Sequence, residues 1–188
     1  LLLLSSCGGK QKAMGEAITE RDSLPVMTTL GVTTLISDSG VTRYRVNTEE
    51  WMMYDRKKPS YWAFEKGVYM EQFDSIFNVE ASIKADTAYY YDKERLWKLI
   101  GNVDIQNRKG ERFNTELLYW NEATQKVYSD KFIRIQQPDR IITGHGFDSN
   151  QQMTIYTIRN IEGIFYVDEE ASSGPPQPET KALPDSVN

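Results

Sequence analysis

The chain has few residues of the kinds that catalysis, metal binding and disulfides require. Its 188 residues include one cysteine, Cys7, and one histidine, His145. A single cysteine excludes an intramolecular disulfide. With no second histidine and no cysteine pair the sequence has no metal-ligand pattern, and no base stands beside an activated nucleophile. We therefore expect a protein that is not an enzyme and needs no cofactor and no metal.

Long apolar runs and an excess of positive charge are also missing. No run approaches the roughly 20 apolar residues that span a bilayer as a helix. The chain has 22 Lys and Arg against 27 Asp and Glu, a net charge of −5, and its longest basic cluster is Arg56-Lys57-Lys58. This balance argues against a nucleic-acid partner. The basic cluster either meets phosphates or anionic headgroups or is a solvated turn.

Cys7 follows four leucines and two serines and precedes two glycines. An apolar segment, small residues and then Cys-Gly-Gly resemble the lipobox of a bacterial lipoprotein signal peptide. This pattern predicts that Cys7 is acylated and anchors the protein to a membrane outside the cytoplasm, since several acyl chains give durable binding. The alternative is an incidental cysteine after a fragment of core strand.

Composition divides the chain into four segments. Residues 1–7 are expected to be the end of the signal peptide with its lipidation cysteine, and residues 8–25 a flexible tether. Residues 26–167 are rich in β-branched and aromatic residues and form the predicted folded domain. Residues 168–188 are acidic and proline-rich, and such a segment cannot bury enough apolar surface to offset its ordering entropy. We therefore predict a disordered tail.

The predicted domain alternates apolar and polar residues with period two, in short runs separated by turn-forming residues. Residues 102–106, 132–136 and 154–158 are examples, and no long stretch shows a helical period. The fold class predicted is all-β: an antiparallel, twisted β-jellyroll or open sandwich built from repeated hairpins. The glycines on both sides of His145 suggest a bend or bulge.

An internal repeat with a period of 30 residues supports the hairpins. Residues 86–92 align with residues 116–122, and the strands that follow stay in register. Strand parity then assigns a set of large apolar residues to one face. This face is either a closed core or the lining of an open lipid groove, and parity does not distinguish the two. Its members are Ala88, Tyr90, Trp97, Leu99, Val103, Ile105, Leu118, Trp120, Val127, Ile133 and Ile135.

Six segments in this order resemble the LptC family of periplasmic lipopolysaccharide-export proteins, within the wider group that includes LptA. They are residues 62–68, 85–90, 97–103, 110–120, 126–130 and 144–147. The resemblance implies a β-jellyroll that opens along one side and holds lipid A acyl chains of lipopolysaccharide, with the apolar face as its trough. It places the protein in the periplasm at the inner membrane, beside an ABC transporter that extracts lipopolysaccharide. Known members have an N-terminal transmembrane helix, whereas this chain has the lipobox-like Cys7.

The resemblance also implies a protein partner. An LptA-like bridge protein would add a strand to the C-terminal sheet edge, where unpaired N–H and C=O groups are available. That edge is expected at Thr154, Ile155, Tyr156, Thr157 and Ile158, or in a short strand at residues 164–167. Two other hypotheses remain open at this point. One is a structural or adhesive envelope lipoprotein with a closed β-domain and no lipid cargo, and the other is a glycan hydrolase on a jellyroll.

Overall fold

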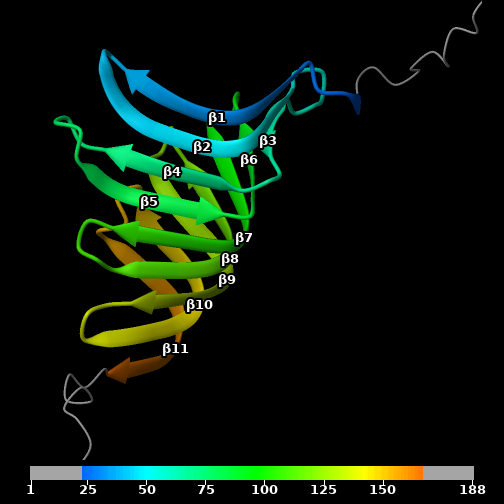
Figure 1. Ribbon diagram of the computed structural model, residues 1–188. Coiled ribbons are helices and arrows are strands. Elements are labelled where there is room, and N and C mark those ends of the chain that lie inside the picture. The colour runs from blue at the N-terminus through cyan, green and yellow to red at the C-terminus, as the bar shows by residue number, and fades with distance from the viewer. Residues whose placement is uncertain (1–22, 167–188) are drawn as a thin grey trace, which may run out of the picture.

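Antiparallel strands make up most of residues 23–166, the part of the chain that the computed structural model describes (Figure 1). This confirms the predicted all-β, jellyroll-like fold class. The strands are β1 (Met27–Asp38), β2 (Val41–Tyr54), β3 (Tyr61–Phe64), β4 (Val68–Phe73), β5 (Val79–Ala85), β6 (Thr87–Tyr91), β7 (Leu96–Asn107), β8 (Arg112–Asn121), β9 (Lys126–Gln136), β10 (Arg140–Asn150) and β11 (Tyr156–Tyr166).

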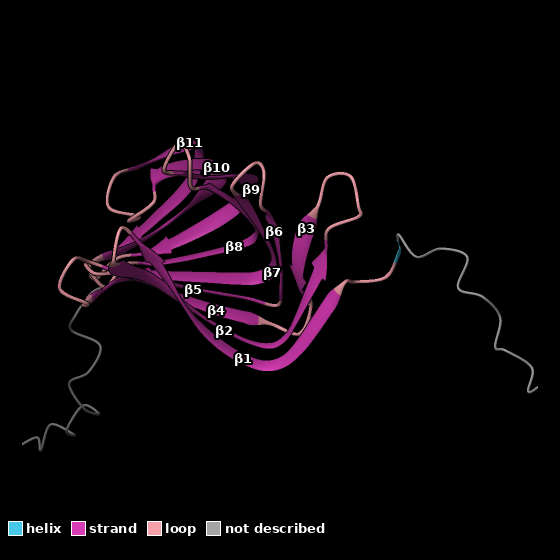
Figure 2. Ribbon diagram, turned by 90° about the horizontal axis from the view of Figure 1, so that it is seen from above, coloured by secondary structure: helices cyan, strands magenta, loops and turns pink. Residues whose placement is uncertain are grey.

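The long strands bend, and each half belongs to a different layer. The first half of β7 pairs with β6 and its second half with β5, while β2 divides in the same way between β4 and β3. These pairings join β2, β4, β5, β7, β6 and β3 into a closed ring, and β8 to β11 continue the sheet beyond it (Figure 2). The bend of β7 falls at Gly101 and Asn102, whose φ angles are 77° and 44°. Asp86 lies at this bend, where its carboxylate accepts a hydrogen bond from Asn102 Nδ2 at 2.6 Å.

The same bend recurs along the sheet at each following strand. Register shifts interrupt β8, β9 and β10 near their centres, and Gly146 in β10 has a φ of 76°. The bulge expected around His145 is therefore present. Bulges of this kind turn a strand sharply without ending its pairing, so two layers form from one continuous sheet.

The repeated hairpins are β6–β7 and β8–β9, and they lie side by side because β7 pairs with β8. Alternate residues of both hairpins point between the two layers, as parity predicted. Leu99, Leu118 and Ile133 are fully buried there, packed with Phe113 and Phe147. The core thus extends from β2 to β11.

Several predicted features fall outside the described residues. Cys7, the rest of the signal-peptide segment 1–7, residues 8–22 of the tether, and residues 167–188, which include the predicted tail, lie there. Within residues 23–166, no helix is sufficiently long and apolar to cross a bilayer.

Candidate functional site

A cavity of about 650 Å³ opens between the layers at the β1–β3 end of the sheet. Aromatic side chains from several strands line it. Trp51 of β2 packs on Trp62 and Phe64 of β3, with ring centroids 5.0 and 5.9 Å away. Tyr90 of β6 and Trp97 of β7 continue the surface, and their rings lie 4.7 Å apart. This aromatic surface suits a hydrocarbon ligand, while polar side chains such as Gln125, Gln151 and Gln152 line other parts of the cavity.

The edge strand β1 supplies one wall of the cavity. Val32, Thr34 and Ile36 line the cavity, whereas Thr33 and Leu35, between them, are exposed. Among the described strands β1 pairs only with β2. The wall is therefore held by a single ladder of backbone hydrogen bonds.

The rim of the cavity is polar, and Glu122 is its centre. This carboxylate, 15 % exposed, accepts hydrogen bonds from Trp97 Nε1 at 2.9 Å and from the Tyr90 hydroxyl at 3.1 Å, and Arg95 lies 3.7 Å away. Burial, and then the charge of Glu122, raise the pKa of Tyr90 to about 12, so its hydroxyl stays a donor at physiological pH. Arg43 lies along the same rim.

The predicted trough residues divide between this cavity and the sealed core. Tyr90 and Trp97 line the cavity. The other nine, from Ala88 to Ile135, are at most 4 % exposed and pack against one another. Sequence analysis did not assign Trp51, Trp62 and Phe64 to the lining, because β2 and β3 lie outside the repeat. The cluster of aromatic residues in 44–64 was the signal that could have identified them.

A turn between β10 and β11 packs against the core, and Gln151 and Gln152 of this turn line the aromatic cavity. Met153 of this turn is 1 % exposed, belongs to the core, and accepts a hydrogen bond at its carbonyl oxygen from Asn107 Nδ2, 2.8 Å away. Asn107 also donates to Glu111 at 2.7 Å, and Glu111 accepts from Gln137 at 2.7 Å and from the Tyr156 hydroxyl at 3.2 Å. The turn is thus held beside the β7–β8 and β9–β10 turns, and residues 150–155 are called the strap below.

Comparison with known proteins places the chain in a family. Residues 19–163 match the family model described as lipopolysaccharide-assembly, LptC-related. The chain belongs to the LptC family. A search of curated proteins gave no match. Membership gives the protein a role in lipopolysaccharide transport in the cell envelope, and it agrees with the resemblance carried by the sequence motifs.

The C-terminal edge of this LptC-family sheet is β11, which pairs only with β10 among the described strands. The predicted edge strand, Thr154–Ile158, starts two residues before β11 does and stops well before β11 ends. Thr154 and Ile155 belong to the strap, where their backbone N–H groups donate to Asn150 Oδ1 at 2.9 and 3.1 Å. Tyr156, Thr157 and Ile158 are in β11, and the strand continues through Gly163 to Tyr166, so the two alternatives were parts of one strand.

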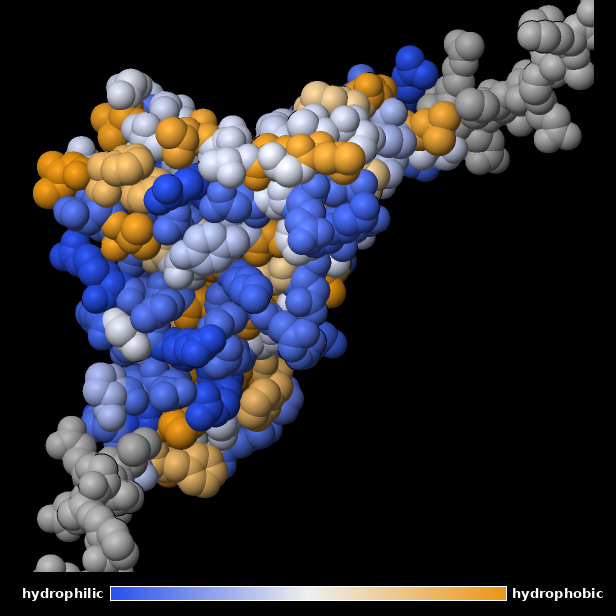
Figure 3. Space-filling model, in the orientation of Figure 1, coloured by the Kyte–Doolittle hydropathy of each residue, from blue (hydrophilic) through white to orange (hydrophobic). Residues whose placement is uncertain are grey.

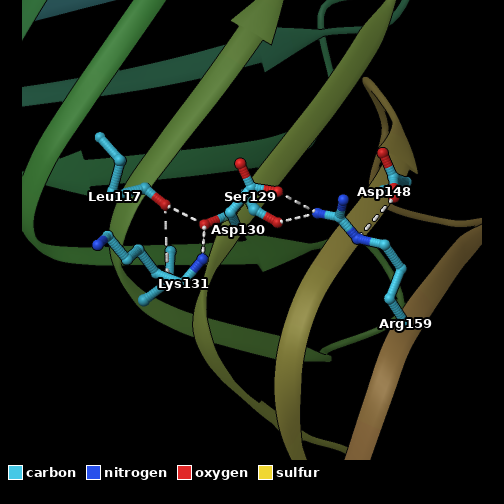
Figure 4. Close-up of polar contacts among 7 residues, drawn as sticks. Leu117, Ser129, Asp130, Lys131, Asp148 and Arg159 are labelled. Atoms are coloured by element: carbon cyan, nitrogen blue, oxygen red, sulfur yellow. Dashed lines mark hydrogen bonds and ion pairs between the residues drawn. The ribbon is translucent and has the colours of Figure 1, made fainter.

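Arg159 fastens this edge strand to its neighbour β10 and to β9, the next strand along the sheet (Figure 4). Its Nη2 donates to the Ser129 carbonyl oxygen at 2.6 Å and to Asp130 at 2.7 Å on β9, and its Nε lies 3.5 Å from Asp148 on β10. Gly146 lies directly beneath, where an added Cβ would stand 2.5 Å from Arg159 Nε. The missing side chain therefore makes room for the arginine.

The remaining candidate for chemistry, His145, lies on the outer surface. Its Nδ1 is 2.6 Å from Glu162 Oε1 across the β10–β11 pair, and its ring packs edge-on against Phe132 at 5.4 Å. In residues 23–166, no group of three or more His, Cys, Asp or Glu side chains could hold a metal ion. His145 is thus a cross-strand contact near the bend of β10.

Proposed function

We propose that this protein is a non-enzymatic lipopolysaccharide carrier of the envelope bridge, with its acyl-chain site in the aromatic cavity. It accepts lipopolysaccharide from an inner-membrane ABC transporter and passes it to an LptA-like β-jellyroll protein. The observation that carries the proposal is the cavity lined by Trp51, Trp62, Phe64, Tyr90 and Trp97, in a chain of the LptC family. Its volume lies within the range of about 300–1,000 Å³ typical of ligand pockets.

The lining explains how a passive protein would hold such a cargo. Each methylene group taken out of water contributes about 0.8 kcal/mol. The polar rim around Glu122 and Arg95 would stay in contact with the sugar part of the ligand, while the acyl chains enter between the layers. Direction must come from the ATP-driven partner, since a groove alone creates no gradient.

Two sheet edges suit a chain of such proteins joined end to end. The outer edges of β1 and β11 have no strand partner in the described part of the chain. On β11, Ile161 and Phe165 are 58 % and 59 % exposed, so an added strand would cover apolar side chains and pair with free backbone groups. We assign the LptA-like partner to β11, and an acylated Cys7 at the other end of the chain would keep the protein at the inner membrane.

Filling the cavity tests the carrier function. Thr34→Trp places a large ring in the cavity, and Thr33→Trp places the same ring on the opposite face of β1. In cells depleted of the native protein, lipopolysaccharide should accumulate at the inner membrane. Thr33→Trp should restore its delivery and Thr34→Trp should not, at equal protein levels. Full rescue by both variants would contradict the proposed site.

The second candidate is a structural envelope lipoprotein without lipid cargo. The observation that favours it is the sealed core, which holds nine of the eleven predicted trough residues. Normal lipopolysaccharide delivery after depletion, together with a weakened envelope, would support this alternative and exclude the carrier.

A further inference from the structure

The basic cluster Arg56-Lys57-Lys58 lies in the turn between β2 and β3, beside the point where the described chain begins. Backbone pairing brings them together, since the Val26 N–H donates to the Met53 carbonyl at 2.8 Å and Met27 is opposite Met53. Arg56 and Lys58 are exposed, and Lys57 is half-buried. Figure 2 shows this turn as a loop that projects beyond the ends of β2 and β3.

Apolar and aromatic residues surround the basic turn. Leu24, Val26 and Met27 are 44 %, 46 % and 37 % exposed, although they are hydrophobic. Tyr54 and Tyr61 stack where the turn meets its strands, with ring centroids 4.9 Å apart. Hydrophobic and hydrophilic side chains lie next to one another at this corner (Figure 3). These eight residues are called the basal patch.

The nearby acidic groups do not cancel the charge of the turn. Asp55 adjoins it in the sequence, but Glu65 and Asp92 lie at the strands and accept hydrogen bonds from the Tyr89 and Ser60 hydroxyls at 3.0 and 2.8 Å. The three cations at the tip of the turn therefore exceed the one carboxylate beside them. This local excess occurs on a protein whose net charge is −5.

We infer that the basal patch docks on the surface of an anionic phospholipid bilayer. Lys and Arg bind anionic headgroups, tyrosine rings favour the interfacial region, and exposed aliphatic side chains enter the boundary of the acyl layer. All three kinds of residue lie at one corner, and in the sequence residues 8–22 connect this corner to Cys7. The 15 residues 8–22 reach at most about 50 Å when extended, so an acylated Cys7 leaves this corner within reach of the membrane.

Docking would fix an orientation that a lipid anchor alone does not provide. The basal patch lies at the β1–β3 end, the same end as the aromatic cavity, and β11 lies at the far end of the sheet (Figure 1). A protein seated on this patch presents the cavity near the membrane and β11 away from it. The consequence for cargo transfer rests on the proposed function, whereas membrane docking itself does not.

Vesicle sedimentation of the full chain tests the inference without any lipopolysaccharide. The parent protein carries Cys7→Ser, so no acyl chain contributes. It should bind vesicles of phosphatidylglycerol mixed with phosphatidylcholine, more weakly at high salt, and should not bind phosphatidylcholine alone. One variant combines Arg56→Glu, Lys57→Glu and Lys58→Glu.

A matched control makes the same change of net charge on β9, with Lys126→Glu, Lys131→Glu and Arg134→Glu. Each basic residue near an anionic surface contributes about a fivefold gain in partitioning, so the turn variant should lose on the order of a hundredfold. The β9 control should bind within a few-fold of the parent. No binding of the parent to anionic vesicles, or equal loss in both variants, would overturn the inference and leave the cavity proposal untouched.

Discussion

Asn107 offers the sharpest test of how the strap is held against the core. Its side chain is buried and makes four hydrogen bonds. Nδ2 donates to Glu111 Oε2 at 2.7 Å and to the Met153 carbonyl oxygen at 2.8 Å. Oδ1 accepts from the backbone N–H groups of Lys109 at 2.9 Å and Glu111 at 3.0 Å. Asn107→Ala removes all four bonds at once.

The magnitude follows from the kinds of bond that are lost. A hydrogen bond to a charged group contributes about 1.5–3 kcal/mol and a neutral one about 0.5–1.5 kcal/mol. Water that enters the opened turn restores part of this, so we expect a loss of about 3 kcal/mol in the free energy of unfolding. For a domain of this size the melting temperature would fall by about 6–12 °C.

Urea unfolding and amide hydrogen exchange measure the effect. Asn160→Ala is the matched control, because Asn160 is exposed on β11 and its side chain makes no hydrogen bond among the described residues. We expect that control to change stability by less than about 0.5 kcal/mol. In Asn107→Ala the amides of the strap should exchange faster than those of β2. Equal unfolding midpoints for the two variants would refute the role assigned to the strap.

Three further predictions concern other contacts. Trp97→Phe should cost about 1.5–3 kcal/mol more than Trp51→Phe in urea unfolding, because Trp97 donates to a carboxylate whereas the indole N–H of Trp51 is buried without a partner among the described residues; equal costs would contradict this. The hydrogen bond from Arg112 lowers the pKa of Asp104, so this pair stabilises the fold above the unfolded pKa, near 4, and the contribution is lost as pH falls through the lower folded value. The stability difference between wild type and Asp104→Asn should therefore shrink from pH 7 toward pH 3, and a constant difference would exclude the pair as its cause. Arg159→Ala should speed hydrogen exchange in β11 and leave β1 unchanged, and unchanged β11 exchange would show that the arginine does not hold the edge strand.

Strand alternation was sufficient to predict much of the fold. The period-two pattern and the 30-residue repeat gave the correct parity for Leu99, Leu118 and Ile133, because inward and outward positions follow from the local sequence. The glycines on both sides of His145 likewise predicted the bulge from the local sequence alone. These features depend on neighbours along one or two strands.

The position of the cavity could not be predicted in this way. Val103 and Ile135 share a face with Trp97, yet they are sealed in the core while Trp97 lines the cavity. The strap takes part in both regions, because Met153 belongs to the same buried cluster as Phe113, distant in sequence, while Gln151 and Gln152 line the cavity. Such a contact depends on the order and bending of strands, and one sequence does not specify these. The start of β11 was missed for a related reason, since Asn150 organises residues 154–155 as a turn although their composition favours a strand.

The central claim is that acyl chains of lipopolysaccharide enter the aromatic cavity. Photo-crosslinking in living cells tests it most directly, with a photoreactive residue at Trp62 inside the cavity or at its neighbour Tyr61 on the opposite face of β3. We predict a lipopolysaccharide adduct at position 62 and none at position 61. No adduct at 62, or equal adducts at both positions, would contradict the account.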